Sequence, residues 1–183
     1  RKRTEALNCR LAAIIEASSD VIGVGTIEGQ LDYLNAAGRA LLGIGADEPL
    51  PHTRFLEYHP DWAARRVQEE GIPAALAQGA WLGDTALLRR DGSEVPVSQL
   101  ILAHRDPATG AVDFTSTICR DLSERIEAEQ ALRRSEDRYR TLFEKTNVSF
   151  VLCDAVLDDS GTLVDYRLID ANPALEIQCG LSR

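Results

Sequence analysis

The side chains best placed to do chemistry are polar groups on segments that otherwise have the pattern of apolar strands: Tyr33, Thr85, Gln99 and Ser116. A buried amide or hydroxyl without a hydrogen-bond partner costs about 1–3 kcal/mol, so Gln99 in particular needs a partner. Small-molecule pockets are mostly apolar with a few convergent polar groups. We therefore predict a ligand-binding cavity lined by these four residues and by Trp81, Leu87, Phe114 and Ile118. The alternatives are that the apolar members are simply core and that Gln99 faces water.

The sequence contains none of the motifs that usually indicate an enzyme. It has no Gly-rich phosphate loop, no His-Glu-x-x-His and no nucleophile elbow. The three histidines, His52, His59 and His104, fall in predicted loops or at a strand end and are expected at the surface. We predict no catalytic residue here, and an enzyme only in a region of a longer protein outside these residues.

The four cysteines are Cys9, Cys119, Cys153 and Cys179. They are far apart, and neither a Cys-x-x-Cys pair nor a neighbouring His at zinc spacing accompanies them. This usage predicts buried thiols in a cytoplasmic protein, with no disulfide and no metal site.

The net charge of −9 argues against a nucleic-acid-binding surface, and solvated helical faces account for it. No apolar run approaches the roughly 20 residues that a membrane span needs, and no signal peptide is present. We expect a cytoplasmic location and no membrane contact within these residues. Because the chain starts without Met, we also expect it to be cut from a longer protein, which could be membrane-tethered elsewhere.

The periodicity of the chain predicts its elements. Residues 4–19 carry the apolar helical stripe Leu7, Leu11, Ile14 and Ile15. Strands follow at 21–26 and 30–34, then a short helix at 36–42 with Asn35 as N-cap and Gly43 as its stop. A helix at 61–78 should be kinked by Pro73, with its possible core contacts at Trp62, Val67, Ile72 and Leu76.

Three strands close this region, at 81–90, 94–105 and 112–120. Alternation places Val95, Val97, Gln99 and Ile101 on one face of the second strand. The same alternation gives the third strand a face made of Phe114, Ser116 and Ile118. We predict an α+β fold whose five-stranded antiparallel sheet has helices on one side. The other side is open, and the leading helix is the candidate to cover it.

One short pattern occurs twice. Asn35-Ala36-Ala37, with Gly43 eight positions after the Asn, returns as Asn172-Pro173-Ala174 with Gly180 at the same spacing. Solenoid repeats have periods of roughly 20–50 residues, whereas about 130 residues separate these copies, so two related domains in series are indicated.

This order of motifs resembles a PAS sensory domain with its C-terminal PAC motif, and the second copy resembles the opening of another. The resemblance rests on Tyr33–Ala37, Gly79–Trp81, Arg89–Val97, Arg120–Arg125, Tyr139–Glu144 and Asp165–Ala174. It implies a flanking helix at 1–19, a first PAS domain at 20–121, a helical linker at 122–145 and an incomplete second PAS domain at 146–183. It further implies a cytoplasmic sensor of bacterial-type signalling, in a two-component histidine kinase or in a diguanylate cyclase or phosphodiesterase.

The family also includes haem and flavin sensors, and this sequence fits neither. The flavin branch carries its reactive Cys within the helical middle, whereas Asn8-Cys9-Arg10-Leu11 lies on the leading helix. Haem-binding members use a His inside the long helix, where this chain has only His59 just before it. The cofactor is therefore left unknown.

The segment from Leu122 to Lys145 contains no Pro or Gly and is predicted to be one helix. Its seam of Leu132, Ser135, Tyr139 and Leu142, joined to the stripe of the leading helix, predicts a parallel homodimer. By the resemblance, Asp121, Leu122 and Ile126 relay a ligand- or partner-induced change to a C-terminal output domain. The alternatives are a solvated single helix and a ligand-free dimerisation or protein-interaction module.

Overall fold

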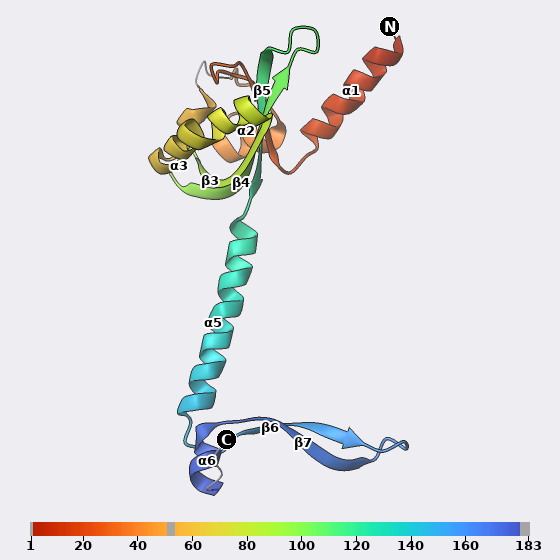
Figure 1. Cartoon of the computed structure of the whole chain (residues 1–183), viewed down its shortest axis with the longest axis vertical. Coiled ribbons are helices and arrows are strands. Elements are labelled where there is room, and N and C mark those ends of the chain that lie inside the picture. The colour runs from red at the N-terminus through yellow and green to blue at the C-terminus, as the bar shows by residue number, and fades with distance from the viewer. Residues whose placement is uncertain (1, 51–53, 180–183) are drawn as a thin grey trace. The chain divides into compact units, whose positions relative to one another are not determined.

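The computed structural model of the chain describes residues 2–50 and 54–179, apart from the side chain of Glu176 (Figure 1). The chain forms two compact units, Arg1–Arg125 and Ile126–Arg183, and each is described by itself. The positions of His52 and Gly180 lie outside the described residues.

The first unit begins with helix α1 (Lys2–Glu16), strand β1 (Val21–Gly25), strand β2 (Leu31–Leu34) and helix α2 (Ala36–Leu42). The side chain of Asn35 caps α2 by accepting a hydrogen bond from the Gly38 amide. Gly43 ends α2 in the left-handed conformation with φ of 70°, which glycine adopts without strain. Both predicted helix signals at this point are confirmed.

The helical middle consists of the short 3-10 helix η1 (Phe55–Tyr58), α3 (Asp61–Arg66), the π-helical turn η2 (Val67–Gly71) and α4 (Ile72–Gln78). Pro73 has no amide hydrogen to continue the α pattern, and the helix adapts by widening, so that Ile72 N–H bonds the carbonyl of Val67. Val67 is buried as predicted, but Trp62 is 49% exposed and lies outside the core. Its indole N–H instead donates to the Glu94 carboxylate across 3.2 Å.

Strands β3 (Ala80–Leu88), β4 (Glu94–Arg105) and β5 (Val112–Asp121) complete a five-stranded antiparallel sheet of order β2-β1-β5-β4-β3. Two clusters of buried side chains form the core on the inner face of this sheet, beneath α2 and the η2–α4 segment. As predicted, β4 contributes Val95, Val97, Gln99 and Ile101 to this face. The α+β fold with its five-stranded antiparallel sheet is confirmed.

The outer face of the sheet is apolar and open. Here Ile118 of β5 lies beside Leu100 of β4, Phe114 of β5 stacks on His104 of β4, and Leu82 of β3 is 69% exposed. The leading helix was the predicted cover, but Leu7, Leu11 and Ile14 are themselves exposed, so α1 does not bury its apolar stripe on this face.

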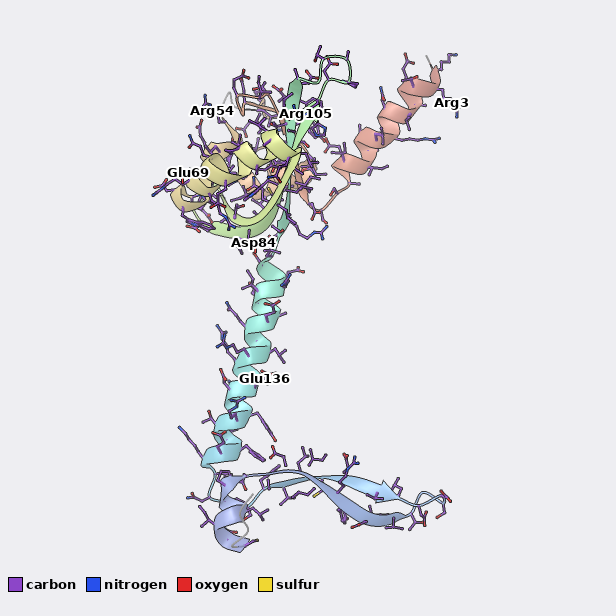
Figure 2. The ribbon with its side chains drawn as sticks, in the orientation of Figure 1. Arg3, Arg54, Glu69, Asp84, Arg105 and Glu136 are labelled. Carbon is purple, nitrogen blue, oxygen red and sulfur yellow. The ribbon has the colours of Figure 1, made fainter. Side chains whose placement is uncertain are left out.

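The second unit contains most of helix α5 (Ser123–Lys145), the hairpin of strands β6 (Val151–Leu157) and β7 (Leu163–Ala171), and helix α6 (Pro173–Cys179). The predicted linker helix is thus present as α5, and none of its residues is buried. Figure 2 shows their side chains, Glu136 among them, standing out from the ribbon. All seven residues of β6 are exposed as well.

The cysteines are free thiols, and Cys119 alone is buried, whereas Cys9, Cys153 and Cys179 are exposed. The prediction of buried thiols is therefore wrong for three of them, because α1 and the second unit lack a covering layer. Within residues 2–50 and 54–179, no group of three acidic, His or Cys side chains is arranged to hold a metal ion. Over the same residues, no helix combines the length and the hydropathy needed to cross a bilayer.

Candidate ligand-binding cavity

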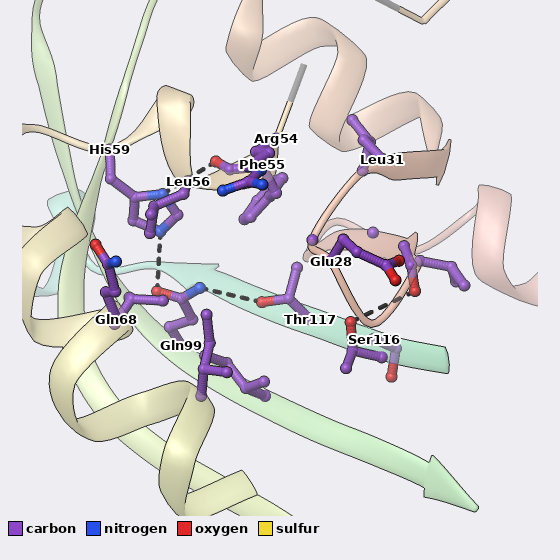
Figure 3. Close-up of a pocket in the computed structure, with 18 residues that line it drawn as sticks. Glu28, Leu31, Arg54, Phe55, Leu56, His59, Gln68, Gln99, Ser116 and Thr117 are labelled. Atoms are coloured by element: carbon purple, nitrogen blue, oxygen red, sulfur yellow. Dashed lines mark hydrogen bonds between the residues drawn. The ribbon is translucent and has the colours of Figure 1, made fainter. Parts of the chain in front are cut away.

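A cavity of about 150 Å³ lies in the first unit between the inner face of the sheet and the helical middle (Figure 3). Its walls come from β1, η1, the η2–α4 segment, β4 and β5. The apolar side chains that border it are Leu31, Phe55, Leu56, Val67, Ile72 and Ile101. The exposed Glu28, Arg54 and Gln68 also border it, whereas the deeper polar groups are His59, Gln99, Thr115 and Thr117.

Gln99 is the centre of a buried hydrogen-bond cluster. Its Oε1 accepts a hydrogen bond from the Thr85 hydroxyl (2.7 Å) and lies 3.1 Å from His59 Nε2. Its Nε2 donates to the Thr117 hydroxyl across 3.2 Å. Gln99 is 1% exposed, so these partners meet the requirement that a buried amide imposes. Figure 3 shows His59 at the oxygen end of the Gln99 amide and Thr117 at its nitrogen end.

His59 is buried, contrary to the surface position predicted for it. Burial lowers the pKa of its imidazole, and the hydrogen bonds from Gln99, Phe55 and Leu56 oppose this only in part. The neutral ring has one N–H, and it belongs on Nδ1, because the Phe55 carbonyl 3.1 Å away can only accept. His59 therefore bonds the Phe55 carbonyl in its uncharged form, and its Nε2 lies against the Gln99 side chain of β4.

The structure separates the predicted lining residues into three groups. Gln99 borders the cavity with its side chain. Ser116 lies in the cavity wall, but its side chain points to the outer face of the sheet, where its hydroxyl lies 2.8 Å from Nε2 of His104. Thr85 does not border the cavity, but its hydroxyl donates a hydrogen bond to Gln99, which does. Trp81 and Leu87 are on the inner side of the sheet but do not line the cavity. Trp81 packs against Gly71, and Leu87 belongs to the core.

The remaining three, Tyr33, Phe114 and Ile118, are on the outer face of the sheet, so the prediction that they line the cavity is wrong. Side chains alternate along a strand, and the residues of β5 that face inward are Thr115, Thr117 and Cys119. The sequence correctly predicted that side chains alternate between two faces of β5, but it did not indicate which face is inward. Thr117 was missed for that reason.

Tyr33 instead fastens α1 to the sheet. Its hydroxyl donates to the Glu16 carboxylate across 2.6 Å, and the other carboxylate oxygen accepts the Ala36 amide at 3.0 Å. Desolvation and then the Glu16 carboxylate raise the pKa of Tyr33 to about 12, so the phenol stays a donor. No sequence signal pairs these residues, which are 17 positions apart.

The junction of β5 with α5 contains the residues predicted to relay a signal. The Asp121 carboxylate accepts the Ser123 amide at 2.7 Å, and the Leu122 amide donates to the Pro96 carbonyl on β4 at 2.9 Å. Ile126 is partly buried. Beside them, Arg120 makes two hydrogen bonds, of 2.9 and 3.2 Å, to the Asp20 carboxylate just before β1.

Comparison with known proteins agrees with this architecture. The sequence profile of the PAS fold family matches residues 15–127, and the chain belongs to this family of sensory domains of signalling proteins. None of the curated proteins matches the chain.

Among solved structures, the PAS domain of an HTR-like protein from Haloarcula marismortui is 28% identical, with a TM-score of 0.54, over 66% of this chain and 95% of that one. A PAS domain from Colwellia psychrerythraea is 19% identical, with a TM-score of 0.58, over 64% of this chain and 98% of that one. A sensory box histidine kinase/response regulator structure from Burkholderia thailandensis is 21% identical, with a TM-score of 0.53, over 73% and 99%.

Proposed function

We propose that this chain is a ligand-sensing relay that dimerises and passes a conformational change through α5 to a downstream signalling output. One observation carries the proposal: the Gln99 cluster connects the cavity to β4 and β5, and β5 runs directly into α5. A molecule that binds against Gln99 therefore acts on the strand that ends at the relay helix.

The path from cavity to helix is short. Gln99 holds Thr117, which lies two residues from Cys119 and four from Asp121 on the same side of β5. Burial raises the pKa of Cys119 to about 12, so this thiol is an inert packing group rather than a reactive one. A ligand that favours one arrangement of β4 and β5 therefore shifts the balance between the conformations of the first turn of α5.

The exposed apolar side chains of the two long helices support a parallel homodimer. Helix α1 presents Leu7, Leu11 and Ile14, with Ile15 partly covered, and α5 presents Leu132, Tyr139 and Leu142. Helices with such stripes bury them against a partner. Multi-angle light scattering that gives a monomer mass at 100 μM would remove this part of the proposal.

We further propose that the second unit is the opening of a second PAS domain, that the protein is cytoplasmic, and that its output is a histidine kinase or a cyclic-di-nucleotide enzyme. The histidine kinase named in the Burkholderia structure supports the first of these outputs. Asn172 supports the domain assignment, because its side chain binds the Phe150 amide and the Val148 carbonyl much as Asn35 binds the segment before and within β1.

Native mass spectrometry tests the sensing part. The purified chain should show a mass excess that disappears on denaturation, and Gln99→Leu should lose it. Ser98→Ala, the neighbouring residue of β4 that faces the other side of the sheet, should keep it. A chain that carries protein mass alone would contradict a retained ligand.

Relay is tested in the full-length protein with Asp121→Ala, which removes the hydrogen bond to the Ser123 amide at the start of α5. We expect output that no longer responds to input, whereas Asp121→Asn keeps an acceptor oxygen and should retain much of the response. Unchanged signalling by the Ala variant would contradict the relay.

The second candidate function is a ligand-free interaction module. The open outer face favours it, because Leu82, Leu100 and Phe114 offer apolar area to a protein partner. A chain that is dimeric without any bound small molecule would favour this function over sensing.

A further inference from the structure

The size of the cavity limits what it can hold. At about 150 Å³ it is well below the 300–1,000 Å³ typical of sites for drug-sized ligands. It is on the order of a cavity that accommodates one benzene ring. A ligand that fits without opening the helical middle therefore has few atoms.

The polarity of the walls limits the charge of the ligand. The charged side chains that border the cavity are Glu28 and Arg54, and both are exposed at its edge. The deep polar groups are the neutral imidazole of His59, the amide of Gln99 and the hydroxyls of Thr115 and Thr117. A buried ion needs a paired counter-charge, and none of these groups provides one. An uncharged ligand is favoured.

The hydrogen-bond capacity of Gln99 indicates what the ligand must offer. An amide has two donor and two acceptor positions, and His59, Thr85 and Thr117 use three of the four. Neutral His59 presents a lone pair on Nε2, which needs the NH2 end of the amide opposite it. The Oε1 end, drawn there in Figure 3, suits the doubly protonated ring. The two arrangements differ by a half-turn of the amide.

With His59 neutral, the amide nitrogen serves His59 and Thr85, and the amide oxygen accepts the Thr117 hydroxyl. The position left over is then a lone pair of the amide oxygen, next to the lone pairs of Thr117. This part of the wall accepts hydrogen bonds, and it requires a donor on the ligand. A hydroxyl is such a donor and also adapts to the other arrangement, because it can accept as well.

We propose that the cavity binds a compact, uncharged organic molecule of about six to ten non-hydrogen atoms whose one hydroxyl group bonds Gln99 and Thr117. Its apolar remainder contacts Leu31, Phe55 and Ile101. This inference rests on the proposed sensing function, and it names the ligand class of the same cavity.

The test titrates the whole 183-residue chain with three probes of similar size, namely phenol, toluene and benzoate. Binding is measured at pH 7.5 from the shifts of the backbone amide NMR signals. Phenol should bind about fivefold to tenfold more tightly than toluene, which corresponds to one buried hydrogen bond. Benzoate, which is charged at this pH, should not bind. The shifts should centre on Gln99 and Thr117.

Two variants isolate the hydroxyl contact. Gln99→Leu should abolish the preference for phenol over toluene, and Ser98→Ala should leave it unchanged. If Gln99→Leu does not fold, Thr117→Val serves instead, because it removes one hydroxyl at nearly constant volume. Toluene that binds as tightly as phenol to the unmodified chain, or benzoate that binds at all, would overturn the proposal.

The result also separates this inference from the proposed function. If no probe binds while native mass spectrometry shows a retained small molecule, the ligand class is wrong and sensing stands. If no probe binds and no mass excess is present, both proposals fail.

Discussion

Asn35 in the first unit and Asn172 in the second make nearly the same hydrogen bonds. Asn35 Oδ1 accepts the amides of Ile22 (3.0 Å) and Gly38 (3.0 Å), and Asn172 Oδ1 accepts those of Phe150 (2.8 Å) and Leu175 (3.3 Å). Each side-chain amide donates to a backbone carbonyl just before the first strand of its own unit, at 2.9 Å. Both asparagines are 0% exposed. In each unit, therefore, the Asn joins the start of the first strand to the start of the short helix that follows the hairpin, and we call this arrangement the corner of the unit.

The surroundings of the two corners differ completely. In the first unit, β1 and β2 pack into a core completed by β4 and β5, and Val21 and Leu34 are each 2% exposed. In the second unit, the hairpin of β6 and β7 leaves residues such as Leu152 and Tyr166 exposed. An Asn cap and a hairpin need only neighbouring sequence, whereas burial of the apolar faces of β1 and β2 needs β4 and β5, which come much later in the chain.

The residue three positions after each Asn reflects this difference. A Cβ at Gly38 would meet Leu34 Cδ1 at 2.5 Å and Val21 Cγ1 at 3.0 Å, so close packing demands glycine. The second copy has Leu175 at this place, and it is only partly buried. The tight helix-to-strand contact of the first corner is absent from the second.

Asn35→Ala should give the largest effect. It leaves the partly buried amide of Ile22 and the buried amide of Gly38 without acceptors, and the expected loss in free energy of unfolding is about 3 kcal/mol. Asn172→Ala should leave the first unit unchanged. Urea unfolding followed by tryptophan fluorescence reports the first unit, because Trp62 and Trp81 are the two tryptophans of the chain. Equal shifts in both variants would mean that the two units unfold as one.

Gly38→Ala should come next. Overpacking a buried contact costs about 1–3 kcal/mol, and the gain in helix propensity over glycine offsets up to about 1 kcal/mol of this. Because Leu34 and Val21 are fully buried, the clash should win and the variant should be less stable. Leu175→Ala, its counterpart, should not change the same urea midpoint. A Gly38→Ala chain that is more stable would show that α2 can move off the sheet.

Acid should destabilise the first unit through His59. Burial lowers its pKa in the folded state below the unfolded value of about 6.5, so below that pH the unfolded chain takes up a proton first. This contribution to stability is complete above about pH 6.5 and is lost as the pH falls towards the folded pKa. The urea midpoint should fall between pH 7.5 and 5.5, and His59→Gln should remove the part of this fall that protonation of His59 causes. The second unit contains no histidine to mask the effect.

Tyr33→Phe should have the smallest effect. It removes the 2.6 Å bond to Glu16 at a partly exposed site, worth about 1 kcal/mol or less. The position two residues before Asn172 holds Asp170, which as a carboxylate has no proton to donate. Hydrogen exchange should speed up in the last turn of α1 and stay unchanged in the last turn of α5. Exchange that is unchanged in α1 would mean that the Ala36–Glu16 bond alone holds its end.

The elements of this fold were predictable because each depends on neighbours in the sequence. The cap at Asn35, the stop at Gly43, the alternation of β4 and the helix at 123–145 all follow from local rules of hydrogen bonding and periodicity. The repeated Asn likewise predicted a second corner like the first. Gln99 could be singled out because an amide among alternating apolar residues needs a partner.

What the sequence could not supply was the identity of that partner and the direction of each face. His59 is 40 positions from Gln99 and Thr117 is 18 positions away, and only the crossing of η1 over β4 and the pairing of β4 with β5 bring them together. Periodicity alone does not distinguish the two faces of a strand, so Phe114 and Ile118 were predicted on the wrong one. That choice belongs to the tertiary structure, because helices α2 to α4 cover one face and exclude water from it.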